Sequence, residues 1–522
     1  MTGPHTALPL SKMLGEARQL IADRRFDEAR AINDRLLASH PQHPGVLMQA
    51  SRLEGVAGRY RNARQFVLDA FKHRPSDETQ LLRLLIRLQV FHLNAEIQTL
   101  VDELLRRPDA SVALLDTAAK TLNQLNQPER AADVITRALQ LHPLSPELRL
   151  TRAHSRLFAG DLNGAEQDIV RHLQARPDNG FAWWLRSKLR RQTAAANHLA
   201  ALEPLVQAGR SGDPRNLTLL AYALHKELDD LGDHAAAAAA LGLACRTKRA
   251  QFEYDDAETG RIFDTLGAMP ALDCATRAAE GSTPIFIVGM HRSGTTLLEQ
   301  LLGGHSQVRR LGELYDYTSE LRYGTDYACK GVMDLELARR MHDVDAAAVG
   351  QAYLDAVAWR LGDEPWFTDK LPSNFLNLGV ICPGLPQAKI LHMVRDPMET
   401  GFSNLRELFG NNTNLYAYDP AEQGAYHRRY ERLMAHWHRQ FPGRILDVHY
   451  AELTSQPEAV MREVASFCGL VYEPGMARLK DDGSHITTAS AVQARGEVRR
   501  REQPKWRPYA DFLAPLAAAL KD

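Results

Sequence analysis

The 522-residue sequence has few cysteines, and they form no pattern typical of a disulfide framework or a zinc site. They are odd in number, include no C-x-x-C pair and lie far apart in the chain, at Cys245, Cys274, Cys329, Cys382 and Cys468. Disulfide-rich domains and structural zinc sites need several cysteines at close, regular spacings. The scattered thiols therefore predict a reducing, cytoplasmic compartment and no metal site.

Long apolar runs and an excess of one charge are also missing. The first 20 residues lack the basic stretch followed by an apolar stretch that marks a signal peptide, and no later segment offers about 18 consecutive apolar residues. Lys and Arg total 63 against 64 Asp and Glu, a formal net charge of -1. This balance argues against a nucleic-acid coat or a basic membrane-surface protein. We therefore expect no transmembrane segment and no nucleic-acid partner.

The first half of the chain does contain a repeat. Prolines recur at positions 41, 75, 108, 143 and 177, at steps of 34, 33, 35 and 34 residues. Small residues precede most of these prolines by 12 positions (Ala29, Ala63, Ala131 and Ala165) and by 24 positions (Ala17, Ser51, Ala119 and Ala153). Small side chains let helices pack closely and proline ends a helix, so each repeat is predicted to be a helix–turn–helix unit. The third unit departs from the pattern, with Leu84 and Glu96 at the small positions.

This periodicity resembles the tetratricopeptide repeat (TPR). A sixth unit is predicted over residues 218–248, with residues 229–233 separating its two helices. Stacked repeats form a curved solenoid with a concave face. We predict a TPR array over residues 8–250 that binds a protein or peptide, either the acceptor or a partner, on that face. The alternative role is spacing and solubility.

The second half changes character. Residues 251–283 are predicted to be linker and connecting helices, and short apolar runs then alternate with helical stretches over residues 284–520. The runs lie at 285–288, 366–368, 388–394 and 445–450. Such alternation is typical of a parallel sheet covered by helices, with ligands at the carboxyl ends of the strands. The predicted fold class is therefore α + α/β: an α-helical solenoid followed by a P-loop-type α/β domain with a central parallel sheet.

The most informative segment is the loop that follows the first of these runs. It reads Gly289-Met290-His291-Arg292-Ser293-Gly294-Thr295-Thr296 and leads into a helix. In a P-loop, backbone N–H groups and a helix N-terminus hold a phosphate. The ATP-binding version has a lysine where Thr295 stands. The loop therefore predicts a phosphate site that is not built for a magnesium-bound triphosphate.

A second cluster follows the third run. Arg395 and Ser403 are eight residues apart, and Pro397 is placed to open a helix between them. Two turns of helix would bring the guanidinium and the hydroxyl to one anion. The alternative is that Arg395 pairs with Asp396 at the start of the helix.

Seven motifs in this order resemble the sulfotransferase family, specifically its tyrosylprotein-sulfotransferase-like branch in bacterial proteins preceded by TPRs. They cover about residues 280–520 and read PIFIVGMHRSGTTLLEQLL, VRRLGELY, WFTDKLPSNF, ILHMVRDPMETGFSNL, DVHYAELTSQPE, TTASAVQARGEV and PKWRPY. The family transfers a sulfuryl group from 3′-phosphoadenosine 5′-phosphosulfate (PAPS) to a hydroxyl or amine. The resemblance thus implies a PAPS-dependent sulfotransferase, with PAPS as donor and no metal.

The resemblance also implies roles for individual residues. Glu313 would accept the proton of the acceptor, while Lys370 and Arg292 would stabilise charge on the bridging oxygen. The implied donor contacts are Arg292, Ser293, Gly294, Thr295 and Thr296 at the 5′-phosphosulfate, Arg395 and Ser403 at the 3′-phosphate, Tyr450 at the adenine, and Ser490 and Lys505 as late phosphate contacts. Of these, Ser490 and Lys505 lie in the segment that departs most from the family pattern, on either side of the unusually charged residues 495–502.

Several alternatives stay open at this point. His305 competes with Glu313 as the base, because other sulfotransferase branches use histidine. Lys370 could instead pair with Asp369 at the surface, and Tyr450 could simply pack in the core. A P-loop kinase and a non-catalytic repeat scaffold are the alternative functions. The branch suggests peptidyl tyrosine as the acceptor, but a glycan, a lipid-linked sugar or a small phenol would fit as well.

Overall fold

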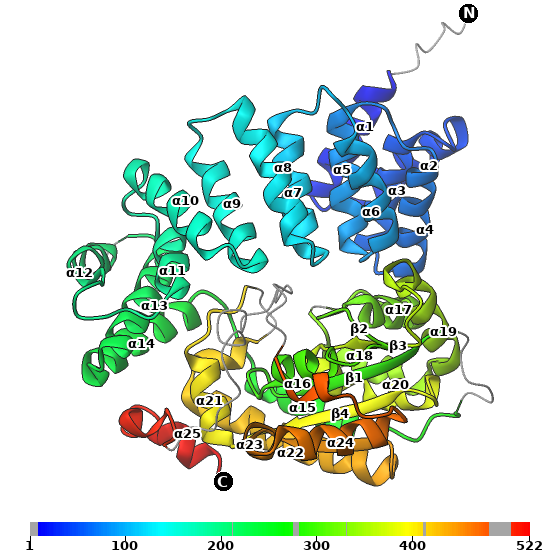
Figure 1. Ribbon diagram of the computed structural model, residues 1–522. Coiled ribbons are helices and arrows are strands. Elements are labelled where there is room, and N and C mark those ends of the chain that lie inside the picture. Colours follow the sequence, from blue (N-terminus) through cyan, green and yellow to red (C-terminus); the bar gives the residue numbers. More distant parts are fainter. Residues whose placement is uncertain are drawn as a thin grey trace, which may run out of the picture.

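The computed structural model describes residues 9–210, 212–274, 281–329, 331–410, 414–479 and 503–521. A curved array of helices leads into one α/β domain, which lies on the inner side of the curve (Figure 1). Ser490, one of the predicted donor contacts, lies outside the described residues. The model supports the predicted order of a helical array followed by a domain with a parallel sheet.

The array consists mainly of consecutive helix–turn–helix pairs. Its helices are α1 (Leu10–Ala22), α2 (Phe26–Ser39), α3 (Pro44–Val56), α4 (Tyr60–Lys72), α5 (Glu78–Val90), α6 (Asn94–Leu105), α7 (Val112–Gln124), α8 (Pro128–Leu141), α9 (Pro146–Ala159), α10 (Leu162–Ala175), α11 (Gly180–Leu189), α12 (Leu199–Gly209), α13 (Pro214–Leu231) and α14 (His234–Arg249). The small residues at the two predicted offsets are each at most 1% exposed. They therefore lie where neighbouring helices approach each other.

Two details differ from expectation. The third unit forms its helix pair in spite of its larger residues, and Leu84 is fully buried there. In the sixth unit the predicted separator is shorter, because α13 continues through Leu231. Gly232, with a φ of 82°, ends α13, and the Asp233 side chain caps α14. Two residues are thus enough for this turn.

A residue in the left-handed conformation follows the first helix in each of the first five pairs. These residues are Arg24 (φ 60°), Gly58 (75°), His92 (49°), Asn126 (61°) and Gly160 (93°), and each stands 34 positions after the one before. The next N–H bonds back to the first helix, as from Gln127 to the Leu122 carbonyl at 2.9 Å. This helix ending favours glycine, because a Cβ is strained in the left-handed conformation. Two of the five turns have glycine and three have a side chain.

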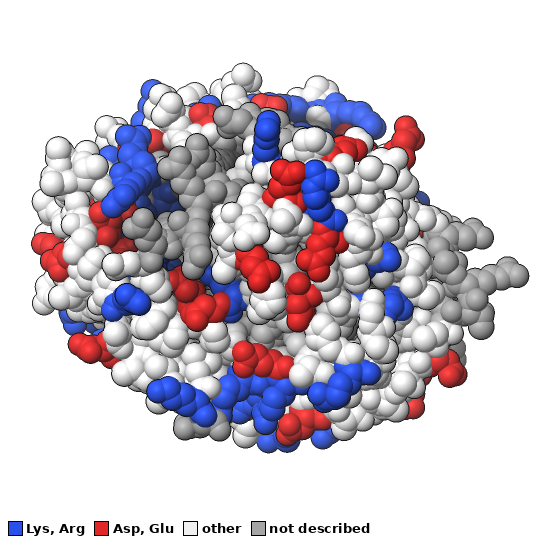
Figure 2. All heavy atoms as spheres, turned by 60° about the horizontal axis from the view of Figure 1, so that its bottom comes forward, with Lys and Arg blue, Asp and Glu red and all other residues white. Residues whose placement is uncertain are grey.

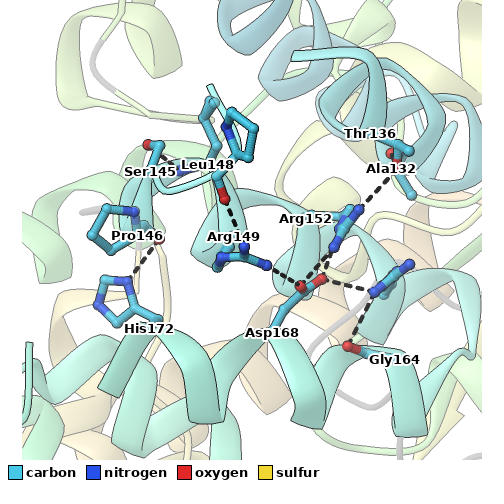
Figure 3. Close-up of polar contacts among 12 residues, drawn as sticks. Ala132, Thr136, Ser145, Pro146, Leu148, Arg149, Arg152, Gly164, Asp168 and His172 are labelled. Atoms are coloured by element: carbon cyan, nitrogen blue, oxygen red, sulfur yellow. Dashed lines mark hydrogen bonds and ion pairs between the residues drawn. The ribbon is translucent and has the colours of Figure 1, made fainter. Parts of the chain in front are cut away.

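A charged network is buried within the fifth pair, between α9 and α10. Asp168 of α10 is 1% exposed and accepts hydrogen bonds from Arg152 at 2.7 Å through both carboxylate oxygens (Figure 3). Arg156 donates to the same carboxylate at 2.8 Å, and Arg149 lies 3.8 Å from it. A buried carboxylate is costly without such partners. The arginines of α9 thus fix the position of α10.

Within the described residues, five strands form one parallel sheet in the order β2-β3-β1-β4-β5. The strands are β1 (Thr283–Gly289), β2 (Val308–Arg310), β3 (Trp366–Asp369), β4 (Lys389–Val394) and β5 (Ile445–His449). The four predicted apolar runs correspond to β1, β3, β4 and β5. The short β2, with two arginines among its three residues, has no such run and was not predicted.

Helices cover both faces of the sheet, so the central strand β1 is buried and apolar. The helical elements of this domain are α15 (Asp256–Gly267), α16 (Thr295–Leu302), α17 (Asp316–Thr325), α18 (Leu335–Arg340), η1 (Met341–Asp343), α19 (Ala346–Val357), η2 (Ala358–Arg360), η3 (Pro372–Asn377), α20 (Leu378–Gly384), α21 (Pro397–Leu405), η4 (Leu415–Tyr418), α22 (Pro420–Gln440), α23 (Tyr450–Ser455), α24 (Pro457–Cys468), η5 (Pro474–Ala477), η7 (Arg507–Tyr509) and α25 (Ala514–Ala519). Phe263 and Leu266 of α15 belong to the same core as β1, so the region predicted as a linker also contributes to this domain.

The array contacts the α/β domain at two junctions. In the N-terminal junction, α4 and the turns after α5 and α7 meet residues 311–326, as in the ion pair between Arg64 and Glu320. In the C-terminal junction, α11, α13 and α14 meet residues 402–409 and 509–516, as in the hydrogen bond from the Tyr222 hydroxyl to the Leu405 carbonyl. The helices between the two junctions arch over the α/β domain (Figure 1).

Charges of both signs are spread over the surface. On the face seen in Figure 2, basic and acidic side chains lie interspersed, as the balanced composition predicts. Within the described residues, no helix has the length and apolar character needed to span a membrane.

Candidate active site

The predicted phosphate loop connects β1 to α16 and is held in a fixed path by two glycines. Gly289 has a φ of 148° and Gly294 a φ of 114°. A Cβ on Gly289 would lie 2.7 Å from the Met393 carbonyl oxygen, and a Cβ on Gly294 would lie 2.5 Å from Cδ2 of Tyr450. Neither backbone conformation nor space allows a side chain at either position. The loop is therefore packed tightly between β4 and the Tyr450 ring.

The residues of this loop fit an anion. Helix α16 begins at Thr295, and the N–H groups of a first helical turn have no partner within the helix. The Ser293 hydroxyl beside them is buried and has no hydrogen-bond partner among the described residues. Arg292 adopts a φ of 66°, a strained conformation of the kind found at functional sites. Backbone donors, a buried hydroxyl and a cation thus gather at one helix N-terminus, where phosphate groups bind.

Arg292 lies at the centre of the second predicted cluster. Its Nε donates to the Ser403 hydroxyl at 3.4 Å, and its carbonyl accepts from Nη1 of Arg395 at 3.0 Å. The Arg395 guanidinium lies 4.3 Å from the centroid of the Tyr450 ring. Burial lowers the pKa of Arg292, while the nearby Glu407 opposes this effect. The structure therefore brings Arg292, Arg395, Ser403 and Tyr450 together.

Arg395 does not pair with Asp396. Asp396 instead caps α21 by accepting from the Glu399 N–H at 2.9 Å, and the ion pair of Arg395 is with Glu399 at 2.8 Å. The Lys505 N–H also donates to Glu399, at 2.9 Å. Lys505 thus reaches this cluster through its backbone, while its side chain is exposed. Tyr450 is half-buried and begins α23 rather than ending β5.

The two predicted catalytic side chains contact each other. The Lys370 ammonium donates to Glu313 Oε1 at 2.7 Å. Lys370 is fully buried, while the Glu313 side chain is 35% exposed. The alternative pairing of Lys370 with Asp369 at the surface is wrong, because Asp369 is buried and accepts from the Tyr353 hydroxyl at 2.9 Å. Burial raises the pKa of Asp369 well above its ordinary value.

His305, the competing base, has hydrogen bonds to the backbone at both ring nitrogens. Nε2 lies 2.9 Å from the Val471 carbonyl oxygen, and Nδ1 accepts from the Gln307 N–H at 3.0 Å. The side chain is buried, 4% of the residue being exposed. These contacts give His305 a structural role between α16 and the segment after α24. They leave Glu313 as the better-placed candidate base.

His291 was not singled out in the sequence, and it links the two clusters. Burial lowers its pKa to about 4, and Glu313, Lys370 and Arg292 all act on its charge. The His291 ring meets Phe409 edge to face, with 5.6 Å between centroids. Its position inside the phosphate loop could have marked His291 as a site residue. The P-loop motif, however, assigns no role to a histidine at this position.

Glu407 and Lys188 were also missed. Glu407 is 4% exposed and follows α21, and its carboxylate accepts from Lys188 of α11 at 2.7 Å. Lys188 of the array therefore pairs with Glu407, the carboxylate that raises the pKa of Arg292. Nothing in the sequence links positions 188 and 407, because only the fold brings them together.

Three further side chains beside the loop lie within 4.8 Å of one another through atoms that could bind a metal, namely those of His392, His438 and Asp447. Asp447 Oδ1 accepts from His392 at 2.7 Å and from His438 at 2.9 Å. They line a cavity of about 230 Å³ that Ser293 and Arg395 also border. These hydrogen bonds tie β4, β5 and α22 together.

A family model described as "Sulfotransferase family" matches residues 284–474. This segment is a sulfotransferase-family domain. Apart from the first residue of β1, it contains the five strands of the described sheet, and it includes every predicted site residue except Ser490 and Lys505.

Two relatives cover different shares of the chain. An uncharacterized protein of Aquifex aeolicus (strain VF5) is 28% identical over 419 residues, which cover 77% of this chain and 54% of that protein. A protein-tyrosine sulfotransferase of Drosophila melanogaster is 26% identical over 189 residues, which cover 35% of this chain and 37% of that protein. The chain thus spans about half the length of the first relative and less of the second.

Two solved structures are each similar to part of the chain. Sulfotransferase STF9 from Mycobacterium avium is 14% identical, with a TM-score of 0.28, over 60% of this chain and 95% of that chain. The C-terminal part of a TPR repeat-containing protein from Cytophaga hutchinsonii is 11% identical, with a TM-score of 0.34, over 45% of this chain and 95% of that chain. Both TM-scores are low, and the sulfotransferase-family domain is identified by the family model over residues 284–474.

Proposed function

We propose that the chain is a PAPS-dependent sulfotransferase that transfers a sulfuryl group to a hydroxyl acceptor. The observation that carries this proposal is the order of the site residues along the carboxyl edge of the sheet. From β2 to β5 in spatial order, the strands are followed by Glu313, Lys370, the phosphate loop, Arg395 and Tyr450. A proton acceptor and a buried cation stand at one end of this row, anion-binding groups in the middle, and an aromatic ring at the other end.

Such a row matches an elongated donor with two anionic groups and a base. Arg292, Ser293, Gly294, Thr295 and Thr296 would hold the 5′-phosphosulfate, Arg395 and Ser403 the 3′-phosphate, and Tyr450 the adenine. Lys505 would add a late phosphate contact from the segment beside Glu399. A kinase would need a lysine where Thr295 stands. The proposal involves no metal.

The residues at the Glu313 end would carry the chemistry. When bound, PAPS supplies the sulfuryl group, whose bond to the phosphate oxygen breaks as the bond to the acceptor oxygen forms. Glu313 would take the proton of the acceptor hydroxyl. Lys370, held 2.7 Å from Glu313 by their ion pair, and Arg292 would stabilise the negative charge on the departing oxygen.

We further propose peptidyl tyrosine as the acceptor. The supporting facts are the name of the Drosophila relative and the array that arches over the α/β domain and could hold a polypeptide. The five free cysteines support a reducing, cytoplasmic compartment. A glycan or a small phenol is the competing acceptor. Labelling a cell extract with the protein and radiolabelled PAPS, then identifying the labelled species, decides between them.

The decisive experiment compares Glu313→Gln with His305→Gln. We expect Glu313→Gln to lower kcat by about 10²- to 10⁴-fold, the usual contribution of a general base. Binding of 3′-phosphoadenosine 5′-phosphate should be unchanged, because Glu313 lies at the far end of the row from Arg395 and Tyr450. His305→Gln, the matched control, should keep most of its turnover. Near-wild-type turnover by Glu313→Gln would remove it as the base, and magnesium-dependent ATP binding would favour a kinase.

A further inference from the structure

The loop that carries Glu313 is held on its inner side by the sulfotransferase domain itself. The Gly312 N–H donates to Glu299 at 2.9 Å, and the Gly312 carbonyl accepts from the Lys370 N–H at 2.9 Å. The Leu311 N–H donates to the Thr368 hydroxyl at 3.3 Å. These bonds link the loop to α16 and β3, the elements that carry the phosphate loop and Lys370.

Two turns of the array touch this loop on either side of Glu313. Asn126 Nδ2 donates to the Leu311 carbonyl at 3.3 Å. The His92 ring stacks on Tyr315, with 5.5 Å between centroids and 14° between ring planes. Leu311 and Tyr315 stand two residues before and two residues after Glu313. The array therefore contacts the Leu311 backbone on one side of the candidate base and the Tyr315 ring on the other.

His92 and Asn126 occupy equivalent positions in consecutive repeats. They are 34 residues apart, and both are the left-handed residue after the first helix of the pair. The repeats on either side have Gly58 and Gly160 at this position, where glycine is the least strained choice. A side chain thus replaces glycine in the two repeats whose turns reach the Glu313 loop.

A neighbouring contact also joins the array to the segment after Glu313. Asn94, two residues after His92, donates to Asp316 at 3.0 Å. Asp316 is 1% exposed and opens α17, the helix that directly follows the loop. The array therefore contacts both the loop and the start of α17, at Leu311, Tyr315 and Asp316.

We propose that His92 and Asn126 are positioning residues for the reaction: the left-handed turns of the third and fourth repeats hold the Glu313 loop against Lys370. The inference rests on the proposed function for the role of Glu313, but the contact itself does not. The array is then part of the catalytic apparatus in addition to any binding of acceptor on its concave face.

The test replaces each side chain with glycine in the full-length protein. Asn126→Gly and His92→Gly suit the backbone conformation and remove the side chain that contacts the loop. Arg24→Gly is the matched control, because Arg24 has the same conformation in the first repeat and its side chain is exposed. Asn126→Asp is a second variant that keeps the size of the side chain but lacks the donor. Two readouts are compared, turnover kinetics and hydrogen exchange of residues 311–320.

We expect kcat to fall about tenfold in Asn126→Gly, Asn126→Asp and His92→Gly, because small displacements of a catalytic group cost this much or more. The KM for PAPS should stay within about twofold, since the donor contacts are elsewhere, whereas a general loss of structure would change both. Exchange of residues 311–320 should become about tenfold faster in these variants. Arg24→Gly should match the wild type in both readouts.

Two outcomes would overturn the inference. The first is wild-type kcat in the Asn126 and His92 variants of an active enzyme. The second is wild-type exchange of residues 311–320 in those variants, which tests the contact even without turnover. If the wild type transfers no sulfuryl group but the exchange differs as expected, the proposed function fails while the contact between array and loop stands.

Discussion

The two junctions between the array and the sulfotransferase domain differ in their chemistry. In the C-terminal junction, Tyr222 of the array and Leu405 of α21 belong to one buried apolar core, together with Tyr509 and Leu513. The N-terminal junction is polar, with the Arg64–Glu320 ion pair at 2.7 Å and the Asn94–Asp316 hydrogen bond at 3.0 Å. The C-terminal junction thus combines a shared apolar core with polar contacts such as the Lys188–Glu407 ion pair, whereas the N-terminal junction is mainly polar.

This difference predicts that the two junctions have different roles in holding the array. An apolar core is favourable in many relative orientations, so it attaches the array strongly but specifies its angle weakly. Hydrogen bonds and ion pairs depend on direction, so they specify the angle but add less net stability. The C-terminal junction would then anchor the array, while the N-terminal junction sets the position of the loop that carries Glu313.

The largest expected effect comes from breaking the C-terminal core. Leu405→Ala should lower the free energy of unfolding by about 3 kcal/mol, a typical cost of a cavity at a fully buried leucine. The backbone carbonyl that accepts from Tyr222 is kept, so the effect isolates the side chain. Chemical denaturation monitored separately in the array and in the sulfotransferase domain measures it.

A matched variant is Leu100→Ala, which lies in the core formed almost entirely within the array. Leu405→Ala should destabilise both parts together, whereas Leu100→Ala should act first on the array. A cost for Leu405→Ala of less than about 1 kcal/mol would contradict a shared core at this junction.

The contrast between the junctions also marks what the sequence could and could not predict. The 34-residue period and the apolar runs depend on local spacing, so they predicted the helix pairs and four of the five strands. The phosphate loop, Arg395 and Tyr450 follow strands directly, and their convergence at one edge of the sheet was predictable for that reason.

The junctions themselves were not predictable from one sequence. Lys188 and Glu407, or Asn126 and Leu311, are brought together by the curvature of the array, which depends on small rotations summed over many repeats. The short strand β2 was missed because its residues lack an apolar pattern. The pairing of Arg395 with Glu399 was missed because it requires the helical register of α21.

A smaller effect is expected at the N-terminal junction. Glu320 is 5% exposed and Arg64 is 14% exposed, and burial raises the pKa of Glu320 even beside Arg64. Arg64→Met would leave this carboxylate without its cation and should cost about 2 kcal/mol, less than a fully buried pair. The double variant Arg64→Met/Glu320→Gln should recover most of this loss. A double-mutant cycle on unfolding free energies gives the coupling, and additive losses would contradict it.

The smallest expected effect concerns acid at the C-terminal junction. His225 is 1% exposed, its Nδ1 lies 2.9 Å from the Ala237 carbonyl oxygen, and its Nε2 accepts from Nε of Arg406 at 3.2 Å. This geometry requires the neutral ring with the proton on Nδ1. Burial, followed by the charge of Arg406, lowers the pKa of His225 from 6.5 to about 4, while the Ala237 carbonyl and Asp229 act in the opposite direction.

Because the pKa is lower in the folded state, the unfolded chain binds the proton first as the pH falls. The contribution of His225 to stability is therefore full above about pH 6.5 and is lost as the pH falls towards about 4. Between about pH 7.5 and about pH 5.5, the wild type should lose about 1 kcal/mol more than His225→Gln, which cannot titrate. Denaturation at the two pH values measures this difference. Equal losses in both proteins would mean that His225 is not held neutral between the Ala237 carbonyl of α14 and Arg406. The C-terminal junction would then lack a polar contact that depends on pH.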